Sequence, residues 1–303
     1  MTHAAVLVLA LLLDALLGEP KWLWNRLPHP AVLMGRLIGW ADTRFNAGLA
    51  RKAKGIALVI GLVVLGWALG TMIAALGWLP QVLAGAILLA QKSLVQHVRA
   101  VAEALRISLP EGRRAVAMIV GRDTAAMDRG AVSRGAIESA AENLSDGVTA
   151  PAFWLLVGGL PGILIYKLVN TADSMIGYRT PRHEAFGWAA ARLDDLLNLI
   201  PARATALILA ALSGHLGDWG SIVAEARRHR SPNAGWPEAA MARSLRVALS
   251  GPRSYHGKMR DFPFVNPEGH RQPGPEAIEA ACTQLWRVWG VLLAGAFLLA
   301  LVF

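Results

Sequence analysis

The sequence contains little cysteine and little charge. Its single cysteine, Cys282, excludes an internal disulfide, a Cys-x-x-Cys zinc or redox site and covalent haem attachment. The eight histidines show neither a His-Glu-x-x-His motif nor another paired spacing, which argues against a zinc site. Gly-x-x-x-x-Gly-Lys-Ser/Thr and Gly-x-Ser-x-Gly motifs are also absent, so a bound nucleotide would be held without a P-loop. A metal site must therefore use carboxylates or histidines.

Charged residues make up 17% of the 303 positions, and hydrophobic residues 54%. Soluble domains average about 25% charged residues, so this composition, with a mean hydropathy of +0.42, favours an integral membrane protein. The net charge of +9 could suggest a nucleic-acid partner. However, the basic residues flank apolar runs and form no RNP, zinc-finger or basic-helix pattern, so we expect a lipid bilayer and no nucleic acid.

The apolar segments predict a mainly α, polytopic integral membrane protein, with residues 1–303 in a single membrane-embedded domain. The first segment lacks a basic n-region and a small-residue cleavage site, so it is expected to be a retained membrane helix rather than a signal peptide. The segment 196–213 is ambiguous, because Pro201 and Arg203 would also suit a helix in the membrane interface. The apolar segments are 1–17, 55–79, 82–96, 148–169, 196–213 and 285–303.

Lysines and arginines gather in the polar segments 18–54, 97–147 and 214–284. By the positive-inside rule these three segments are expected to be cytoplasmic. The residues Gly77-Trp78-Leu79-Pro80 separate two apolar segments without any charge, which is typical of a tight hairpin with an interfacial tryptophan.

The segment 148–169 is interrupted by Gly158-Gly159-Leu160-Pro161-Gly162. Each half has only about ten residues, or roughly 15 Å of helix, which is too short to cross a bilayer. The segment therefore either enters the membrane and returns as a broken, re-entrant segment, or crosses once with a Gly/Pro kink.

Four charged residues recur at intervals of four: Arg134, Glu138, Glu142 and Asp146. On a helix they form one stripe that turns by about 40° per step, and Gly147 is expected to end that helix. Carboxylates on one face could bind Mg²⁺, which takes a few carboxylate oxygens together with waters and phosphates. The alternative is an exposed face with an Arg134–Glu138 ion pair.

Two further groups of polar residues flank the apolar segment 148–169. In Gly121-Arg122-Asp123-Thr124, either Asp123 or Thr124 could cap the following helix, and Arg122 could add a charge for a phosphate, although a cap alone is the more common case. Asn170 to Arg179, continued by Arg192, Asp194 and Asp195, would form either a buried ion-pair network or a site for a metal-bound triphosphate.

Five blocks of this sequence resemble the adenosylcobinamide-phosphate synthase family of cobalamin biosynthesis, also called CbiB or CobD. They occur in the family's order over nearly the whole chain, which makes the set far more specific than any one block. The last block has no chemical role that the sequence suggests. The blocks are Asp14-Ala-Leu-Leu-Gly-Glu-Pro with His29-Pro30 and Met34-Gly35, Gly121–Thr124, Glu138–Pro151, Asn170–Arg179 and Ser231–Met241.

The resemblance implies an ATP-dependent amide ligase that joins adenosylcobyric acid to aminopropanol phosphate, or to aminopropanol, and yields adenosylcobinamide phosphate. It also implies a bacterial inner-membrane protein with a cytoplasmic active site, and other enzymes of the corrinoid pathway as partners. A membrane transporter and an AmpE-like membrane regulator are the alternatives, because broken helices and intramembrane charges also mark solute pathways.

On the ligase route we expect the polar side chains to converge in one cavity at the cytoplasmic face of the membrane. The proposed Mg²⁺ ligands are Glu138, Glu142, Asp146 and Asp173. The residues expected to act in catalysis are Glu142, Asp173, Asp194, Asp195 and Arg192, of which Asp194 or Asp195 would take a proton from the amine. The residues expected to bind ATP or substrate are Arg122, Asp123, Thr124, Asn143, Ser145, Asn170, Ser174, Arg179 and His29.

Overall fold

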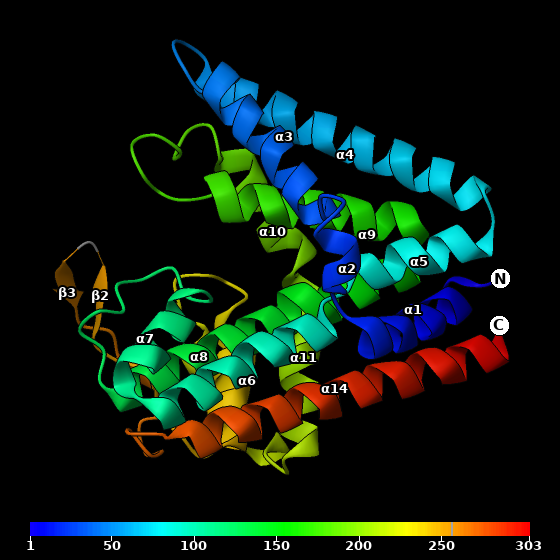
Figure 1. Cartoon of the computed structure of the whole chain (residues 1–303). Helices are drawn as coiled ribbons and strands as arrows, with labels where there is room; N and C mark the ends of the chain where they lie inside the picture. The colour runs from blue at the N-terminus through cyan, green and yellow to red at the C-terminus, as the bar shows by residue number, and fades with distance from the viewer. Residues whose placement is uncertain (256) are drawn as a thin grey trace. The chain divides into compact units, whose positions relative to one another are not determined.

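A computed structural model of the chain describes residues 1–255 and 257–303, without the side chains of residues 255 and 258. Most of the described residues are helical, and several helices are long and apolar enough to cross a membrane (Figure 1). The predicted fold class, a polytopic helical membrane protein, is confirmed. The chain divides into two compact units, and the prediction that they form one membrane domain stays a prediction.

The first unit comprises Met1–Lys92, Ala150–Leu199 and Leu292–Phe303. Its longest helices, α4 and α9, pack against each other, and α1 packs against α5 (Figure 1). Its helices are α1 (His3–Leu17), α2 (Lys21–Trp24), α3 (Pro30–Phe45), α4 (Arg51–Ala75), α5 (Trp78–Leu88), α9 (Ala150–Ile176), α10 (Trp188–Leu197) and the end of α14 (Pro275–Val302).

The second unit comprises Ser93–Thr149 and Ile200–Val291. It contains two short antiparallel pairs of strands, which the sequence did not predict: β1 with β4, and β2 with β3. Its helices are α6 (Gln91–Ile107), α7 (Leu109–Ala117), α8 (Arg129–Leu144), α11 (Leu199–Leu212), α12 (Trp219–Ala226), α13 (Gly235–Ser244) and the start of α14, and its strands are β1 (Leu249–Ser250), β2 (Arg253–Tyr255), β3 (Lys258–Arg260) and β4 (Phe264–Val265).

Among the described residues, four helical stretches are long and apolar enough to span a bilayer: Arg51–Ala75, Trp78–Ile107, Arg129–Ile176 and Pro275–Val302. The ambiguous segment around 196–213 is a bent pair, α10 and α11, with an angle of 44° between them. Helix α1 has only 15 residues, or about 22 Å. It is therefore shorter than the roughly 20 residues that a crossing requires, and it differs from the expected first membrane span.

Helix α9 is broken at Gly159, where φ is 59° and ψ is −154°. In a straight helix, residues 154 and 162 would be about 12 Å apart along the axis. A Cβ built on Gly162 would instead lie 2.4 Å from the carbonyl oxygen of Trp154, so the two arms bend sharply toward each other. The predicted break is confirmed, and this bend favours a segment that enters and returns.

Helix α4 packs its glycine face against the second arm of α9. A Cβ on Gly70 would lie 2.4 Å from the Cα of Pro161, and one on Gly66 would lie 3.0 Å from the Cα of Ile165. Small residues let helix backbones approach closely in a membrane, where apolar burial provides little driving force between helices. This contact fixes the arm of α9 that leads to Asn170 and Asp173.

Candidate functional site

Glu138 is the centre of a buried charged cluster in the second unit. One of its carboxylate oxygens, Oε2, lies 3.0 Å from Nη1 of Arg122 and 3.3 Å from Nη2 of Arg253, and the other accepts a hydrogen bond of 2.7 Å from the backbone N–H of Ser250. All three charged side chains are at least 89% buried. We call Glu138, Arg122, Arg253 and Ser250 the Glu138 cluster. It holds two guanidinium groups next to one carboxylate, an arrangement suited to binding anionic oxygens.

A small residue of α8 allows this cluster to form. A Cβ on Gly135 would lie 2.7 Å from Nη2 of Arg122, so the glycine leaves room for the guanidinium to cross this helix and reach Glu138 one turn further on. The neighbouring Asp123 fixes the loop before α8, because its Oδ2 accepts hydrogen bonds from Ser254 Oγ at 2.7 Å and from the N–H of Gly257 at 2.8 Å. Residues far apart in the sequence therefore form one site.

Two local expectations for α8 are wrong. Asp128, rather than Asp123 or Thr124, caps the helix, since its side chain accepts from the N–H of Ala131 at 2.6 Å. Gly147 does not end the helix, because a π-helical turn, Ser145–Thr149, continues the chain directly into α9. The cap forms four or five residues later than predicted, because Asp123 is engaged by the β2–β3 segment.

The predicted stripe on α8 passes from the interior to the surface. Arg134 and Glu138 are buried, Glu142 and Asn143 are exposed, and Asp146 is half-buried. The 40° turn per step explains this change. Arg134 donates to the carbonyl of Arg271. The alternative of an exposed face with an Arg134–Glu138 ion pair is therefore wrong for the buried half of the stripe.

Three predicted substrate-binding residues of this unit lie near the cluster in sequence but differ in exposure. Thr124 is half-buried. Asn143 donates from Nδ2 to the carbonyl of Ser139 at 2.9 Å. Ser145 is buried, and its hydroxyl has no hydrogen-bond partner among the residues that the structure describes. The role of these three residues in substrate binding therefore stays a prediction.

Glu238 on α13 is a buried carboxyl group beside the Glu138 cluster. It is 3% exposed, its Oε1 lies 3.6 Å from Nε2 of His229, and its Oε2 has no hydrogen-bond partner in the described part of the chain. Burial first, and then repulsion by Glu138 and Glu142, raises the pKa of Glu238 well above its usual range. Burial also lowers the pKa of His229. The pair therefore favours a protonated carboxyl next to a neutral imidazole.

The Glu238→Gln substitution should change the pH dependence of stability. Because the folded protein keeps the Glu238 proton to a higher pH than the unfolded chain does, the free energy of unfolding falls as the pH rises above about 4.3, the usual glutamate pKa. Glutamine removes this fall, so the variant should gain stability relative to the wild type between pH 4.5 and pH 8. Thermal unfolding in detergent at both pH values measures the difference, and parallel profiles would contradict the raised pKa. Glu268→Gln, at an exposed position, is the control and should leave the profile unchanged.

Asp194 belongs to a buried network in the first unit. Its Oδ1 accepts from Asn170 Nδ2 at 3.1 Å and its Oδ2 accepts from Asn198 Nδ2 at 3.1 Å. Tyr166 in turn donates its hydroxyl to Asn198 Oδ1 at 3.0 Å. Since both oxygens are engaged and the residue is 8% exposed, Asp194 suits a structural role better than the proposed role of proton acceptor.

Asp195 lies beside two other predicted site residues, Arg179, expected to bind ATP or substrate, and Arg192, expected to act in catalysis. Arg192 and Arg179 are both close enough to attract its carboxylate, and both are exposed. Asp173 is half-buried and Ser174 is exposed, in the last turn of α9. The first unit therefore brings Arg179, Arg192 and Asp195 together at the end of α9 and in α10.

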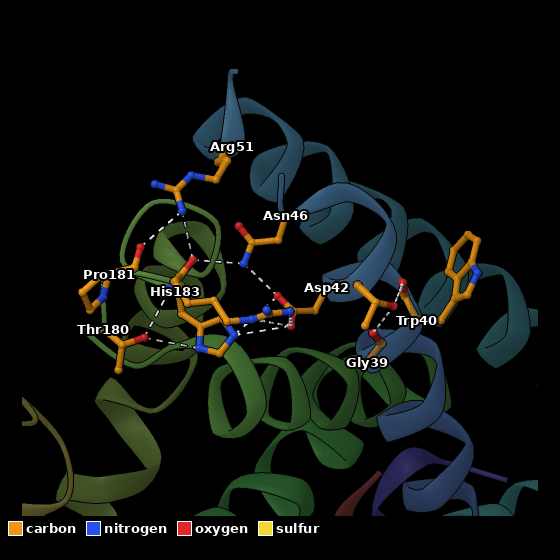
Figure 2. A network of polar contacts seen from close by, with 10 residues as sticks. Gly39, Trp40, Asp42, Asn46, Arg51, Thr180, Pro181 and His183 are labelled. Atoms are coloured by element: carbon orange, nitrogen blue, oxygen red, sulfur yellow. Dashed lines mark hydrogen bonds and ion pairs between the residues drawn. The ribbon is translucent and has the colours of Figure 1, made fainter. Parts of the chain in front are cut away.

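The loop that carries Arg179 is held in place by Asp42 of α3 (Figure 2). Arg182 donates to Asp42 Oδ2 from Nη2 at 2.6 Å, and His183 Nε2 lies 3.4 Å from the same carboxylate. Partial burial opposes ionisation of Asp42, but hydrogen bonds from Arg182, Asn46 and His183 outweigh it and lower the pKa of Asp42. Asn46 also donates to the carbonyl of Arg182 at 3.0 Å, so two side chains of one helix end fix this loop.

His29, a predicted substrate-binding residue, caps α3. Its Nδ1 accepts from the N–H of Ala31 at 3.2 Å, and its ring packs edge-on against Trp24 at 4.5 Å. Burial lowers the pKa of His29. These contacts account for the His29-Pro30 pair as the start of a helix.

The geometry can be compared with known proteins. The family model described as CobD/Cbib protein matches residues 7–285. The chain belongs to the CobD/Cbib family. The chain is 48% identical over 306 residues to the Cobalamin biosynthesis protein CobD of Brucella suis biovar 1 (strain 1330), and 49% identical over 308 residues to that of Rhizobium meliloti (strain 1021). Each comparison covers 95% of this chain and 94% of the relative.

A third relative, the Cobalamin biosynthesis protein CobD of Rhodobacter capsulatus, is 48% identical over 277 residues, with 88% of each chain covered. No solved structure matches the chain. The resemblance that the five blocks carried is therefore confirmed at the level of the CobD/Cbib family, over nearly the whole chain.

Sequence reasoning did not find Arg253, Ser250, His229 and Glu238. The one available signal was the Ser231–Met241 block, in which Glu238 is the only acidic residue of a stretch of small and apolar residues. In this family member the block is also held by α11, since Arg203 donates to Asn233 Oδ1 at 2.6 Å and to the carbonyl of Pro232 at 3.1 Å. The block thus places Glu238 against the Glu138 cluster.

Proposed function

We propose that this protein is an ATP-dependent ligase of cobalamin biosynthesis that joins adenosylcobyric acid to aminopropanol phosphate, giving adenosylcobinamide phosphate. The observation that carries the proposal is membership of the CobD/Cbib family across residues 7–285, together with relatives named for cobalamin biosynthesis. We further propose that it acts in the inner membrane of a bacterium, with its site on the cytoplasmic side, in line with its apolar helices and basic polar segments.

The reaction forms an amide from a free carboxylate and an amine, which is unfavourable in water at neutral pH. In the proposed first step, a propionate oxygen attacks the γ-phosphorus of ATP, the bond from that phosphorus to the bridging oxygen breaks, and ADP leaves. The amine nitrogen then attacks the acyl carbon, a C–N bond forms and phosphate leaves. The ammonium proton passes to a base, for which we retain Asp195, beside Arg179 and Arg192.

The Glu138 cluster supports phosphoryl transfer through fixed positive charge. Arg122 and Arg253 are held against one carboxylate, and Nε of Arg122 is a buried donor without a hydrogen-bond partner among the described residues. Preorganised cations stabilise negative charge on a transferring phosphoryl group without a cost of reorganisation. Arg122 would bind an anionic oxygen, while Glu138 positions it.

Mg²⁺ would accompany ATP and neutralise charge on its phosphates. Among the described residues, no three His, Cys, Asp or Glu side chains are gathered as a metal site. Glu138 is a poor candidate ligand, because two arginines and a backbone N–H already contact its carboxylate. Mg²⁺ usually needs only one or two protein carboxylates beside phosphates and waters, so Glu142 and Asp146 in the second unit, and Asp173 in the first, remain the proposed ligands.

The decisive experiment is to incubate the purified, detergent-solubilised protein with adenosylcobyric acid, ATP, Mg²⁺ and either aminopropanol phosphate or aminopropanol. Mass spectrometry should detect a cobinamide-type amide product that requires ATP, and the preferred amine identifies the second substrate. ATP-dependent product would not arise from a transporter or a regulator. Complete absence of product with both amines would contradict the ligase proposal.

The metal assignment can be tested separately through ADP release. Glu142→Gln and Asp173→Asn should each lower the turnover by at least about tenfold, because each removes a charge proposed to hold the metal–phosphate complex. Glu103→Gln, an exposed residue on α6, is the matched control and should retain full turnover. Unchanged turnover in both Glu142→Gln and Asp173→Asn would refute the assignment.

A further inference from the structure

Two adjoining cavities lie in the second unit, next to the Glu138 cluster. The larger has a volume of about 510 Å³ and lies between α12, the end of α13 and the loop 266–269. The smaller lies between the end of α12 and the strand segment that contains Ser250 and Arg253. Both are lined by Glu225 and Arg228, so these residues stand at their junction. Pockets for small molecules typically have volumes of roughly 300–1,000 Å³, which includes the larger cavity.

Most acidic groups in the cavity walls are already engaged. Glu225 accepts hydrogen bonds from Arg243 Nη1 at 2.6 Å and Nη2 at 2.9 Å, and Asp218 Oδ2 lies 2.7 Å from His215 Nδ1. Arg228 and Arg246 are exposed and form no ion pair with any residue that the structure describes. Apart from Glu268, the groups that remain to attract a ligand are therefore cationic.

The walls also contain unusual backbone conformations. Four non-glycine residues in the described chain have positive φ, and three of them line these cavities: Arg246 at 54°, Ser250 at 63° and Asn266 at 52°. Such conformations are unfavourable for residues with a Cβ, and they concentrate where a structure holds a ligand or a reacting group. Asn266 is fixed in place by a hydrogen bond of 3.0 Å to the carbonyl of Val247.

The smaller cavity connects this cationic surface to the Glu138 cluster. Ser250 and Arg253 both line the cavity and both contact Glu138. We propose that the two cavities together bind one phosphate-bearing ligand, whose anionic group contacts Arg228 at their junction. The inference rests on the proposed function only for the identity of the ligand, which is either ATP or the phosphorylated amine.

Calorimetric titration of the full-length protein in detergent tests the proposal, with ATP without added metal and aminopropanol phosphate as separate ligands. Arg228→Gln should weaken the binding of one of them by at least about tenfold, because it removes a charged donor that contacts a phosphate. The affected ligand is the occupant of the site. Arg227→Gln is the matched control: Arg227 is the adjacent residue, is equally basic and exposed, and lines neither cavity, so binding should stay within about twofold of the wild type.

Arg246→Gln, which changes another cationic residue that lines the larger cavity, provides a second test and should weaken the binding of the same ligand. The thermal midpoint of each variant verifies folding. Equal affinities of Arg228→Gln and Arg227→Gln for both ligands would overturn the proposal, even if the wild type makes amide product. Conversely, a loss of binding in Arg228→Gln would support the site even if no amide is formed, so the two failures can be distinguished.

Discussion

Replacing Glu138 by glutamine should strongly impair both stability and the proposed ligase activity. The substitution leaves the buried guanidinium groups of Arg122 and Arg253 without their shared carboxylate. Removing one partner of a buried ion pair costs about 3–5 kcal/mol, so the thermal midpoint in detergent should fall markedly. Product formation should fall by at least about 100-fold, because the two arginines would no longer be held in a fixed position.

Loss of activity in an unstable variant would not by itself locate the site, so Arg122→Lys is the companion substitution. Lysine keeps the positive charge opposite Glu138 but lacks the planar guanidinium fork. We expect this variant to fold and to lose at least about tenfold in turnover. Glu279→Gln, which breaks the exposed ion pair with Arg106, is the control and should change neither stability nor turnover measurably. Wild-type stability of Glu138→Gln would contradict the description of the cluster as a buried ion-pair site.

The sequence predicts the membrane fold because its strongest signals are local. Long apolar runs indicate helices of spanning length, and the Gly/Pro interruption marks the bend at Gly159. Local signals fail where tertiary contacts compete. Asp123 looks like a helix cap but is engaged by Ser254, and Gly147 looks like a helix end but lies within a buried π-helical turn.

The candidate site could be predicted only in part for the same reason. The stripe on α8 identifies Glu138, and the Gly121–Thr124 block identifies Arg122, but neither pattern indicates that the two side chains meet. Arg253 and Glu238 lie more than 90 residues from α8, and no periodicity within one helix can predict that they reach it. Glu142 belongs to the second unit, whereas Asp173 and Arg192 belong to the first. The convergence of these three residues therefore stays a prediction.

The contact between α4 and α9 should be as sensitive to substitution as the charged cluster. Gly70→Leu places a side chain where even a Cβ would lie 2.4 Å from the Cα and 2.5 Å from the N of Pro161. Because both are backbone atoms of a packed arm, neither can move aside as a flexible side chain would. Overpacking of this kind costs typically 1–3 kcal/mol and occasionally more, so the folded, monodisperse fraction in detergent should fall sharply.

Gly61→Leu in the same helix is the matched control, since a Cβ at Gly61 has no atom within 4 Å and the residue is exposed. It adds the same side chain to the same apolar segment, so hydrophobicity and membrane insertion change equally in both variants. Size-exclusion profiles and thermal midpoints should therefore be near wild type for Gly61→Leu and strongly altered for Gly70→Leu. Equal behaviour of the two variants would mean that the glycine face of α4 does not hold the second arm of α9, and the positions of Asn170 and Asp173 would then need another explanation.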